Sequence, residues 1–135
     1  MTRETLLDTD VLSLVMRRRP DAVFHAKEYL KHHPRLSISA ITAYEVMRGL
    51  KTQGAAAKLA DFHVFCRASR ILPCTFQIAE IAANIYADLK QRGELLDHAD
   101  ILIAATAIAH DCCLATNNAK HFSRIPRLSL VGWTS

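Results

Sequence analysis

Short apolar runs alternate with longer amphipathic stretches along the chain. The runs at Thr5–Leu7, Leu36–Ile38, Ile71–Leu72, Cys112–Ala115 and Leu128–Val131 have the length of buried strands. The stretches between them carry apolar residues at the three- and four-residue spacing of helices. This alternation predicts β-α-β units around a parallel sheet that helices cover on both faces.

Residues that begin and end helices mark the boundaries of the longer stretches. Pro20 suits a first helical turn, Pro34 stops the helix that follows, and Gly54 and Gly93 end two others. The expected helices begin near Val11 and at Pro20, and then span Ala40–Thr52, Ala55–Ala68, Phe76–Lys90 and Asp97–His110. We therefore expect a three-layer α/β/α fold with a central parallel sheet of four to five short strands.

Length and composition favour one folded domain over residues 1–135. Half of the 135 residues are apolar, and only 4 Gly and 4 Pro occur, which excludes a disordered or low-complexity chain. Lys and Arg number 17 against 13 Asp and Glu, giving a formal charge of +4. The mild positive charge favours anionic partners such as RNA.

The cysteines and the longest apolar run indicate in which cellular compartment the protein is expected. The cysteines include an adjacent pair and no C-x-x-C motif, so we expect buried thiols in a reducing cytoplasm: Cys66, Cys74, Cys112 and Cys113. The longest apolar run, Ile101–Ala109, is far shorter than the ~20 residues that a membrane span needs. We expect no membrane partner.

Two polar segments follow strands of the predicted sheet, where parallel α/β folds bind ligands. Asp8 comes directly after Leu6 and Leu7, and the segment 116–118 follows the fourth strand. A carboxylate buried beside a central strand needs a cation or several N–H donors. Asp8 could instead cap the next helix, but Asp10 is better placed to do so.

Asp100 opens the most apolar helix. It shares a helix face with the small residues Ala104 and Ala107, so its carboxylate is expected to point toward packed structure. The alternative is a favourable charge in the first turn. Asp97 either lies on the same face or is the helix cap.

Glu45 lies on a mixed helix face, opposite the apolar stripe. An ion pair with Arg48 along the helix is the alternative explanation for both residues. Together with Asp8 and Asp100, however, Glu45 completes three carboxylates from separate segments. Such a set suits Mg²⁺ or Mn²⁺, which activates water for attack on a phosphodiester. The chain lacks a Gly-rich phosphate loop, G-x-S-x-G and H-E-x-x-H, so P-loop, serine-hydrolase and zinc-protease chemistry has no basis here.

Four segments in this order together resemble a PIN domain of the VapC toxin type. They span nearly the whole chain: Leu6–Leu12, Ser39–Gly49, Asp100–Ala107 and Leu114–Phe122. The resemblance implies a Mg²⁺- or Mn²⁺-dependent endoribonuclease, the toxin of a toxin–antitoxin pair. It also implies a small VapB-like antitoxin as partner, and a homodimer.

The resemblance also implies the roles of individual residues. Asp8, Glu45 and Asp100 match the acids that bind the metal ion and the attacking water, and Thr116 matches a Thr or Ser that supports the site. Many relatives carry Asp where this chain has Asn118, which can still orient a water.

Other relatives carry an acid at the position of His121. The lower negative charge argues against a second bound ion. His121 is either a Mn²⁺ ligand or a surface residue. Asp10 stands where relatives often have Asn. It either adds a carboxylate to the site or only helps the chain to turn.

Basic residues near these segments are candidates for RNA contact. We single out Arg17, Arg48 and Lys120, although a solvated surface is the ordinary explanation for such residues. Further candidates near the acids are Lys90, Arg92 and Arg124. Trp133 is expected to be a packing anchor.

Two rival functions stay open at this point. The segment Asp8–Val11 also fits the nucleophile motif of a haloacid-dehalogenase-like phosphatase, in which Asp8 would attack phosphorus. That family needs a later acidic motif at a strand end, which Asp97 and Asp100 do not provide. The other rival is a degenerate PIN fold that binds RNA or a protein without catalysis.

Overall fold

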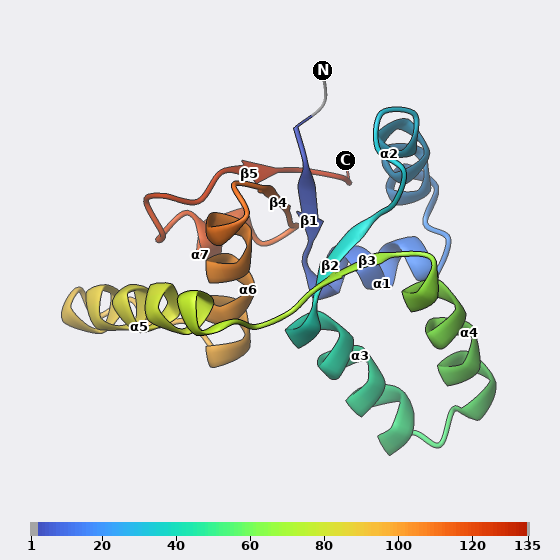
Figure 1. Cartoon of the computed structure of the whole chain (residues 1–135), viewed down its shortest axis with the longest axis horizontal. Coiled ribbons are helices and arrows are strands. Elements are labelled where there is room, and N and C mark those ends of the chain that lie inside the picture. The colour runs from blue at the N-terminus through green and yellow to red at the C-terminus, as the bar shows by residue number, and fades with distance from the viewer. Residues whose placement is uncertain (1–2, 135) are drawn as a thin grey trace.

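The computed structural model describes residues 3–134. At its centre is a five-stranded sheet in the order β3-β2-β1-β4-β5, and every neighbouring pair is parallel (Figure 1). The strands are β1 (Thr5–Leu7), β2 (Ser37–Ser39), β3 (Arg70–Leu72), β4 (Cys113–Ala115) and β5 (Leu130–Val131). The predicted parallel sheet is thus confirmed, with β1 in the middle of it.

Seven helices connect the strands within the described residues. They are α1 (Thr9–Met16), α2 (Pro20–Leu30), α3 (Ala40–Thr52), α4 (Ala56–Arg67), α5 (Phe76–Gln91), α6 (His98–Ala109) and α7 (Ala119–Phe122). α1 begins at Thr9, earlier than the expected start near Val11. The sequence pattern missed α7, whose 4 residues are too few to show a period. α5 ends as expected, because Gly93 takes a φ of +68°, which favours glycine.

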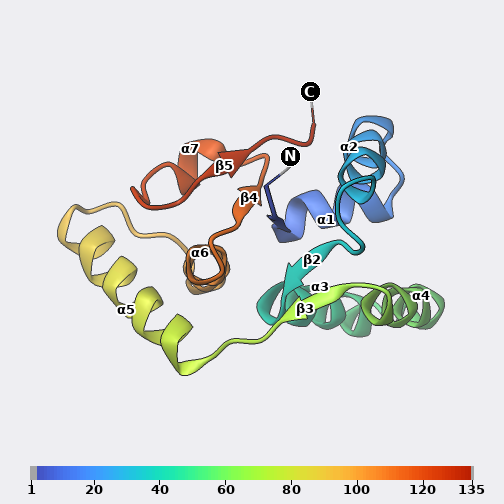
Figure 2. The same ribbon diagram turned by 45° about the horizontal axis from the view of Figure 1, so that its top comes forward.

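Alternate residues of each strand supply the cores on the two faces of the sheet. Leu6 and Leu114 pack into one core with α5 and α6, while Leu7 and Ala115 pack into the other with α1, α2 and α4. Figure 2 shows α5 and α6 on one side of the molecule and α3 and α4 on the other. Helices on both faces leave the strand ends as the place where polar residues gather.

Smaller predictions have mixed outcomes. Trp133 is buried and lies against Tyr29, as a packing anchor should. All four thiols are free, but the expectation that they are buried holds for Cys112 alone: Cys66 and Cys113 are half-buried, and Cys74 is exposed in the turn before α5. Within residues 3–134, no helix is both long and apolar enough to cross a membrane.

Candidate active site

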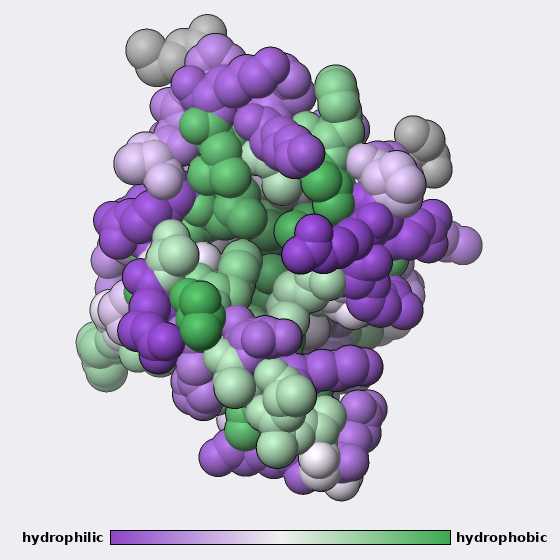
Figure 3. Space-filling model, turned by 90° about the vertical axis from the view of Figure 1, so that its right-hand side faces the viewer, coloured by the Kyte–Doolittle hydropathy of each residue, from purple (hydrophilic) through white to green (hydrophobic). Residues whose placement is uncertain are grey.

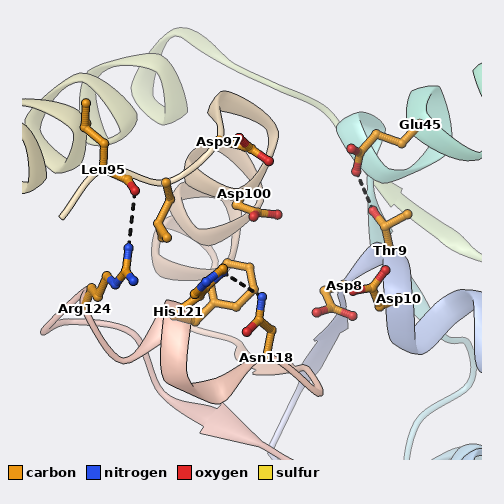
Figure 4. A pocket seen from close by; sticks show the side chains of 12 residues that line it. Asp8, Thr9, Asp10, Glu45, Leu95, Asp97, Asp100, Asn118, His121 and Arg124 are labelled. Atoms are coloured by element: carbon orange, nitrogen blue, oxygen red, sulfur yellow. Dashed lines mark hydrogen bonds between the residues drawn. The ribbon is translucent and has the colours of Figure 1, made fainter.

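An acidic cleft of about 440 Å³ opens at the carboxyl ends of β1 and β4. Its two walls come from separate parts of the chain: β1, α1 and α3 form one, and α6 and α7 form the other (Figure 4). The sequence-predicted residues that line it are Asp8, Asp10, Glu45, Asp97, Asp100, Asn118 and His121. Residues far apart in the sequence thus meet at the edge of the sheet where ligands of such folds bind.

Asp8 combines the two roles that the sequence analysis treated as alternatives. Its Oδ1 accepts a hydrogen bond of 2.7 Å from the backbone N–H of Val11, so Asp8 caps α1, and the assignment of the cap to Asp10 is wrong. Asp10 lies in the first turn of α1 and is exposed. The sequence misled here because α1 starts two residues early, which places Asp8 at the capping position.

Burial governs the acidity of Asp8. The side chain is 5% exposed, and burial raises the pKa of its carboxyl to about 6. Hydrogen bonds from the Thr116 hydroxyl and the Val11 N–H lower this pKa, while the charges of Asp10 and Asp100 raise it. A carboxylate held here against burial and repulsion is one that a cation would stabilise.

Glu45 is held in place by a hydroxyl from α1. The Thr9 Oγ1 donates a hydrogen bond of 2.6 Å to Glu45 Oε1, and it lies 3.1 Å from the hydroxyl of Thr42. Ser39 caps α3 by accepting from the N–H of Thr42. The alternative pairing of Glu45 with Arg48 is not seen: the Arg48 guanidinium lies 5.2 Å from the centre of the Tyr44 ring.

The facing wall carries Asp97 and Asp100 at the start of α6. Asp97 occupies the N-cap position but makes no side-chain capping bond, and it points into the cleft beside Asp100 (Figure 4). Asp100 is half-buried. Burial raises the pKa of its carboxyl, the charges of Asp97, Glu45 and Asp10 raise it further, and His121 lowers it. The carboxylates of Asp10, Glu45, Asp97 and Asp100 therefore repel one another across the cleft.

The floor and lower wall come from the segment after β4. Thr116 is buried beneath Asp8, and its hydroxyl accepts a hydrogen bond of 2.9 Å from the N–H of Asn118. The Asn118 side-chain nitrogen lies 2.8 Å from Nδ1 of His121 on α7. A bend at Asn117 separates Thr116 from these residues, and the two hydrogen bonds join Thr116, Asn118 and His121 into one connected group.

The donor set fits a hard divalent cation. It offers carboxylate and amide oxygens, which Mg²⁺ and Mn²⁺ prefer. Within residues 3–134, no three His, Cys, Asp or Glu side chains are gathered closely enough to enclose a metal ion. Mg²⁺ keeps several of its waters and needs only one or two carboxylates, so this spacing suits it.

The three predicted RNA-contacting cations lie outside the acidic cleft. Lys120 lines a neighbouring cleft with Arg92 and Arg124, and Arg124 also reaches the acidic one. Arg17 lines a different groove, and Arg48 is exposed over Tyr44. The sequence analysis missed Thr9 as a site residue, because its contact with Glu45 joins positions 36 residues apart.

An apolar groove of about 600 Å³ adjoins the acidic cleft. It lies between α1, α3 and α4 and is lined by Met16, Val46 and Leu50. It shares Thr9, Asp10 and Glu45 with the cleft. Figure 3 views the side that carries α2 and α4 and shows apolar residues gathered in a hollow between hydrophilic ones.

Comparisons with known proteins agree with this architecture. The family model of the PIN domain matches residues 5–128. The chain is 31% identical over 133 residues to the ribonuclease VapC2 of Rickettsia felis, covering 95% of this chain and 96% of that protein. It is 37% identical over 94 residues to the ribonuclease VapC1 of Methanocaldococcus jannaschii, covering 70% and 67%.

Solved structures extend the likeness to three dimensions. The VapBC2 complex of Rickettsia felis, bound to a promoter DNA fragment, contains a chain that superposes with a TM-score of 0.85 at 27% identity, over 96% of this chain and 98% of that one. DNA-bound VapBC from Salmonella typhimurium also gives 0.85 at 27% identity, over 98% and 99%. With its parallel five-stranded sheet, its acidic cleft and these matches, the chain belongs to the PIN-domain family, among the VapC-type members.

Proposed function

We propose that this protein is a divalent-metal-dependent endoribonuclease and the toxin of a toxin–antitoxin pair that acts in the cytoplasm. The observation that carries the proposal is the meeting of Asp8, Glu45, Asp97 and Asp100 in one cleft at the edge of the sheet. The names of the VapC relatives, which are ribonucleases, support the substrate class. A phosphatase is not favoured, because the family match covers residues 5–128 and is to a PIN domain.

Asp8 and Asp100 would hold Mg²⁺ or Mn²⁺, with Glu45 bound directly or through water. A divalent ion so held supplies an acidified water for attack and neutralises charge that develops on the phosphate. We propose one ion, because Asn118 and His121 stand where a fourth acid would add negative charge.

Neighbouring residues keep these carboxylates in position. The Val11 N–H and the Thr116 hydroxyl fix the Asp8 carboxylate, and the Thr9 hydroxyl fixes Glu45. Asn118 is placed to orient a water or the substrate, and Asp97 and Asp10 add negative charge at the rim. Without a cation, this concentration of negative charge would repel an RNA phosphate.

The test is cleavage of a mixed single-stranded RNA by the full chain and by Asp8→Asn, with Mn²⁺ or with EDTA. Asp111→Asn is the matched control, since Asp111 lies at the far end of α6 on the surface. We expect cleavage by the parent and the control in Mn²⁺ only. Equal cleavage by Asp8→Asn would contradict the assignment. RNA binding that no chelator affects, without cleavage, would favour a non-catalytic binding module.

We further propose that a small VapB-like antitoxin binds the apolar groove. The structural neighbours are VapBC complexes, and the groove reaches Glu45, so a partner seated there would also cover one wall of the cleft. We also propose a homodimer, which light scattering of the purified chain tests directly. Mass spectrometry of proteins retained by the tagged chain identifies the partner.

A further inference from the structure

His121 brings an imidazole into a cleft whose other charged side chains are mostly carboxylates. Among the described residues that line the cleft, Arg124 carries the other basic side chain. Its Nη1 lies 3.3 Å from the carbonyl oxygens of Glu94 and Leu95, which hold it at the rim (Figure 4). The imidazole, in contrast, lies beside Asn118 and near enough to Asp100 to affect the pKa of that carboxyl.

The ring of His121 has a fixed position. Phe122, the next residue, is 2% exposed and anchors α7 in the core. The backbone N–H groups of His121 and Phe122 both donate to the carbonyl of Asn118, at 3.1 and 3.2 Å. The side chain is exposed, and its ring faces the Asn118 side chain, whose nitrogen lies 2.8 Å from Nδ1 and orients the ring.

The same contact decides which ring nitrogen carries the hydrogen. The Asn118 side-chain nitrogen is a donor, so Nδ1 of His121, 2.8 Å away, accepts. A neutral imidazole that accepts at Nδ1 carries its hydrogen on Nε2. A protonated Nε2 offers no lone pair to a metal ion, whereas it is a good donor to an anionic oxygen.

We propose, resting on the ribonuclease function above, that His121 is a substrate-contact residue whose Nε2–H donates to a nonbridging phosphate oxygen of the RNA. Asp8, Asp10, Glu45, Asp97 and Asp100 all face the same space, so an RNA phosphate needs such a donor to enter it.

The experiment measures RNA affinity without turnover. A fluorescent single-stranded RNA is titrated with Asp8→Asn protein in Mg²⁺ at low salt, alone and combined with His121→Ala. We expect the protein that also carries His121→Ala to bind the RNA at least about tenfold more weakly, which is the contribution of one hydrogen bond to a charged group. His121→Gln, which keeps an N–H donor, should restore most of the affinity. His32→Ala is the control, since His32 is exposed at the opposite edge of the sheet.

Calorimetric titration with Mn²⁺ and no RNA separates the two roles of His121. His121→Ala should bind Mn²⁺ within twofold of the parent, and His121→Glu should bind it more tightly while binding RNA more weakly. The proposal is overturned if His121→Ala keeps full RNA affinity, or if it loses Mn²⁺ affinity about tenfold. If the parent cleaves RNA and His121→Ala binds it normally, only this inference fails; if the parent neither binds nor cleaves RNA, the proposed function fails with it.

Discussion

The acidic cleft and the apolar groove share Thr9, Asp10 and Glu45 but differ in the rest of their lining. In the cleft, carboxylates from distant segments face one another, and burial and repulsion raise the pKa values of Asp8 and Asp100. In the groove, Met16, Val46 and Leu50 present apolar surface. The cleft therefore suits a cation and a phosphate, and the groove suits a protein side chain. Substitutions in the cleft should affect RNA cleavage, and substitutions in the groove should affect partner binding.

The largest expected effect is on cleavage when a cleft acid is neutralised. Asp100→Asn removes a proposed metal ligand, and we expect RNA cleavage in Mn²⁺ to fall at least about 100-fold. Initial rates on a labelled RNA measure the loss. Asp88→Asn on the exposed face of α5 is the control and should cleave normally. A cleavage rate of Asp100→Asn within threefold of the parent would remove Asp100 from the site.

A substitution in the apolar groove should weaken partner binding and leave cleavage unchanged. Leu50→Gln keeps the side-chain size but places a polar amide in the groove, so binding of the antitoxin should weaken about tenfold or more. The cleavage rate of the free chain should stay within twofold. Affinity is measured against the partner that mass spectrometry of proteins retained by the tagged chain identifies. Val64→Gln, at an exposed apolar residue of α4 outside the groove lining, is the control. Unchanged affinity in Leu50→Gln would exclude the groove as the docking site.

A substitution of Thr9, which lines both the cleft and the groove, should reduce the cleavage rate by a smaller factor. Thr9→Val removes the hydroxyl that holds Glu45, and cleavage should fall about tenfold, as for other residues that orient metal ligands. The loss should be partly recovered at high Mn²⁺ concentration, because the carboxylate itself remains. Thr9→Ser keeps the hydroxyl and serves as control. Equal rates for the valine and serine variants would mean that this hydrogen bond does not position Glu45.

The smallest effect is on stability without metal. Because the folded state raises the pKa of Asp8 from its ordinary 3.8 to about 6, folding favours its protonated form. The free energy of unfolding should therefore fall as pH rises from about 4 to 6, and then level off. Asp8→Asn keeps the helix cap and removes the buried charge, so at pH 7 it should be more stable by about 2 kcal/mol.

Urea unfolding in EDTA at several pH values measures both the slope and the gain. Asp111→Asn, at an exposed site, should unfold like the parent. Saturating Mn²⁺ should reverse the order and make the parent the more stable protein, since a ligand that binds only the folded state stabilises it. An Asp8→Asn protein less stable than the parent in EDTA would contradict the burial argument.

Hydrophobic spacing was enough to predict the sheet and six helices. Short apolar runs are buried as strands, and apolar stripes at helical spacing are buried as one face of a helix. Asp8 and Asp100 were found for a related reason, since each lies where a strand ends or a buried helix begins. The resemblance to a family supplied Glu45, which on its own helix looks like an ordinary surface acid.

What the sequence left out depends on contacts between distant residues. The hydrogen bond from Thr9 to Glu45 appears only when α1 and α3 pack together. The cap was assigned to Asp10 because the start of α1 depends on backbone geometry at the end of β1, which spacing does not reveal. α7 is a single turn, and it alone brings His121 toward Asn118.

The central place of β1 has a consequence for how this molecule is made. β1 pairs with β2 on one side and with β4 on the other, and β4 begins only at Cys113. During synthesis, β1 cannot pair with β4 until β4 has been made, and the edge of the sheet that carries Asp8 is incomplete until then. Asp8 is therefore synthesised long before the second wall of its cleft, so the order of the strands decides when the site is assembled.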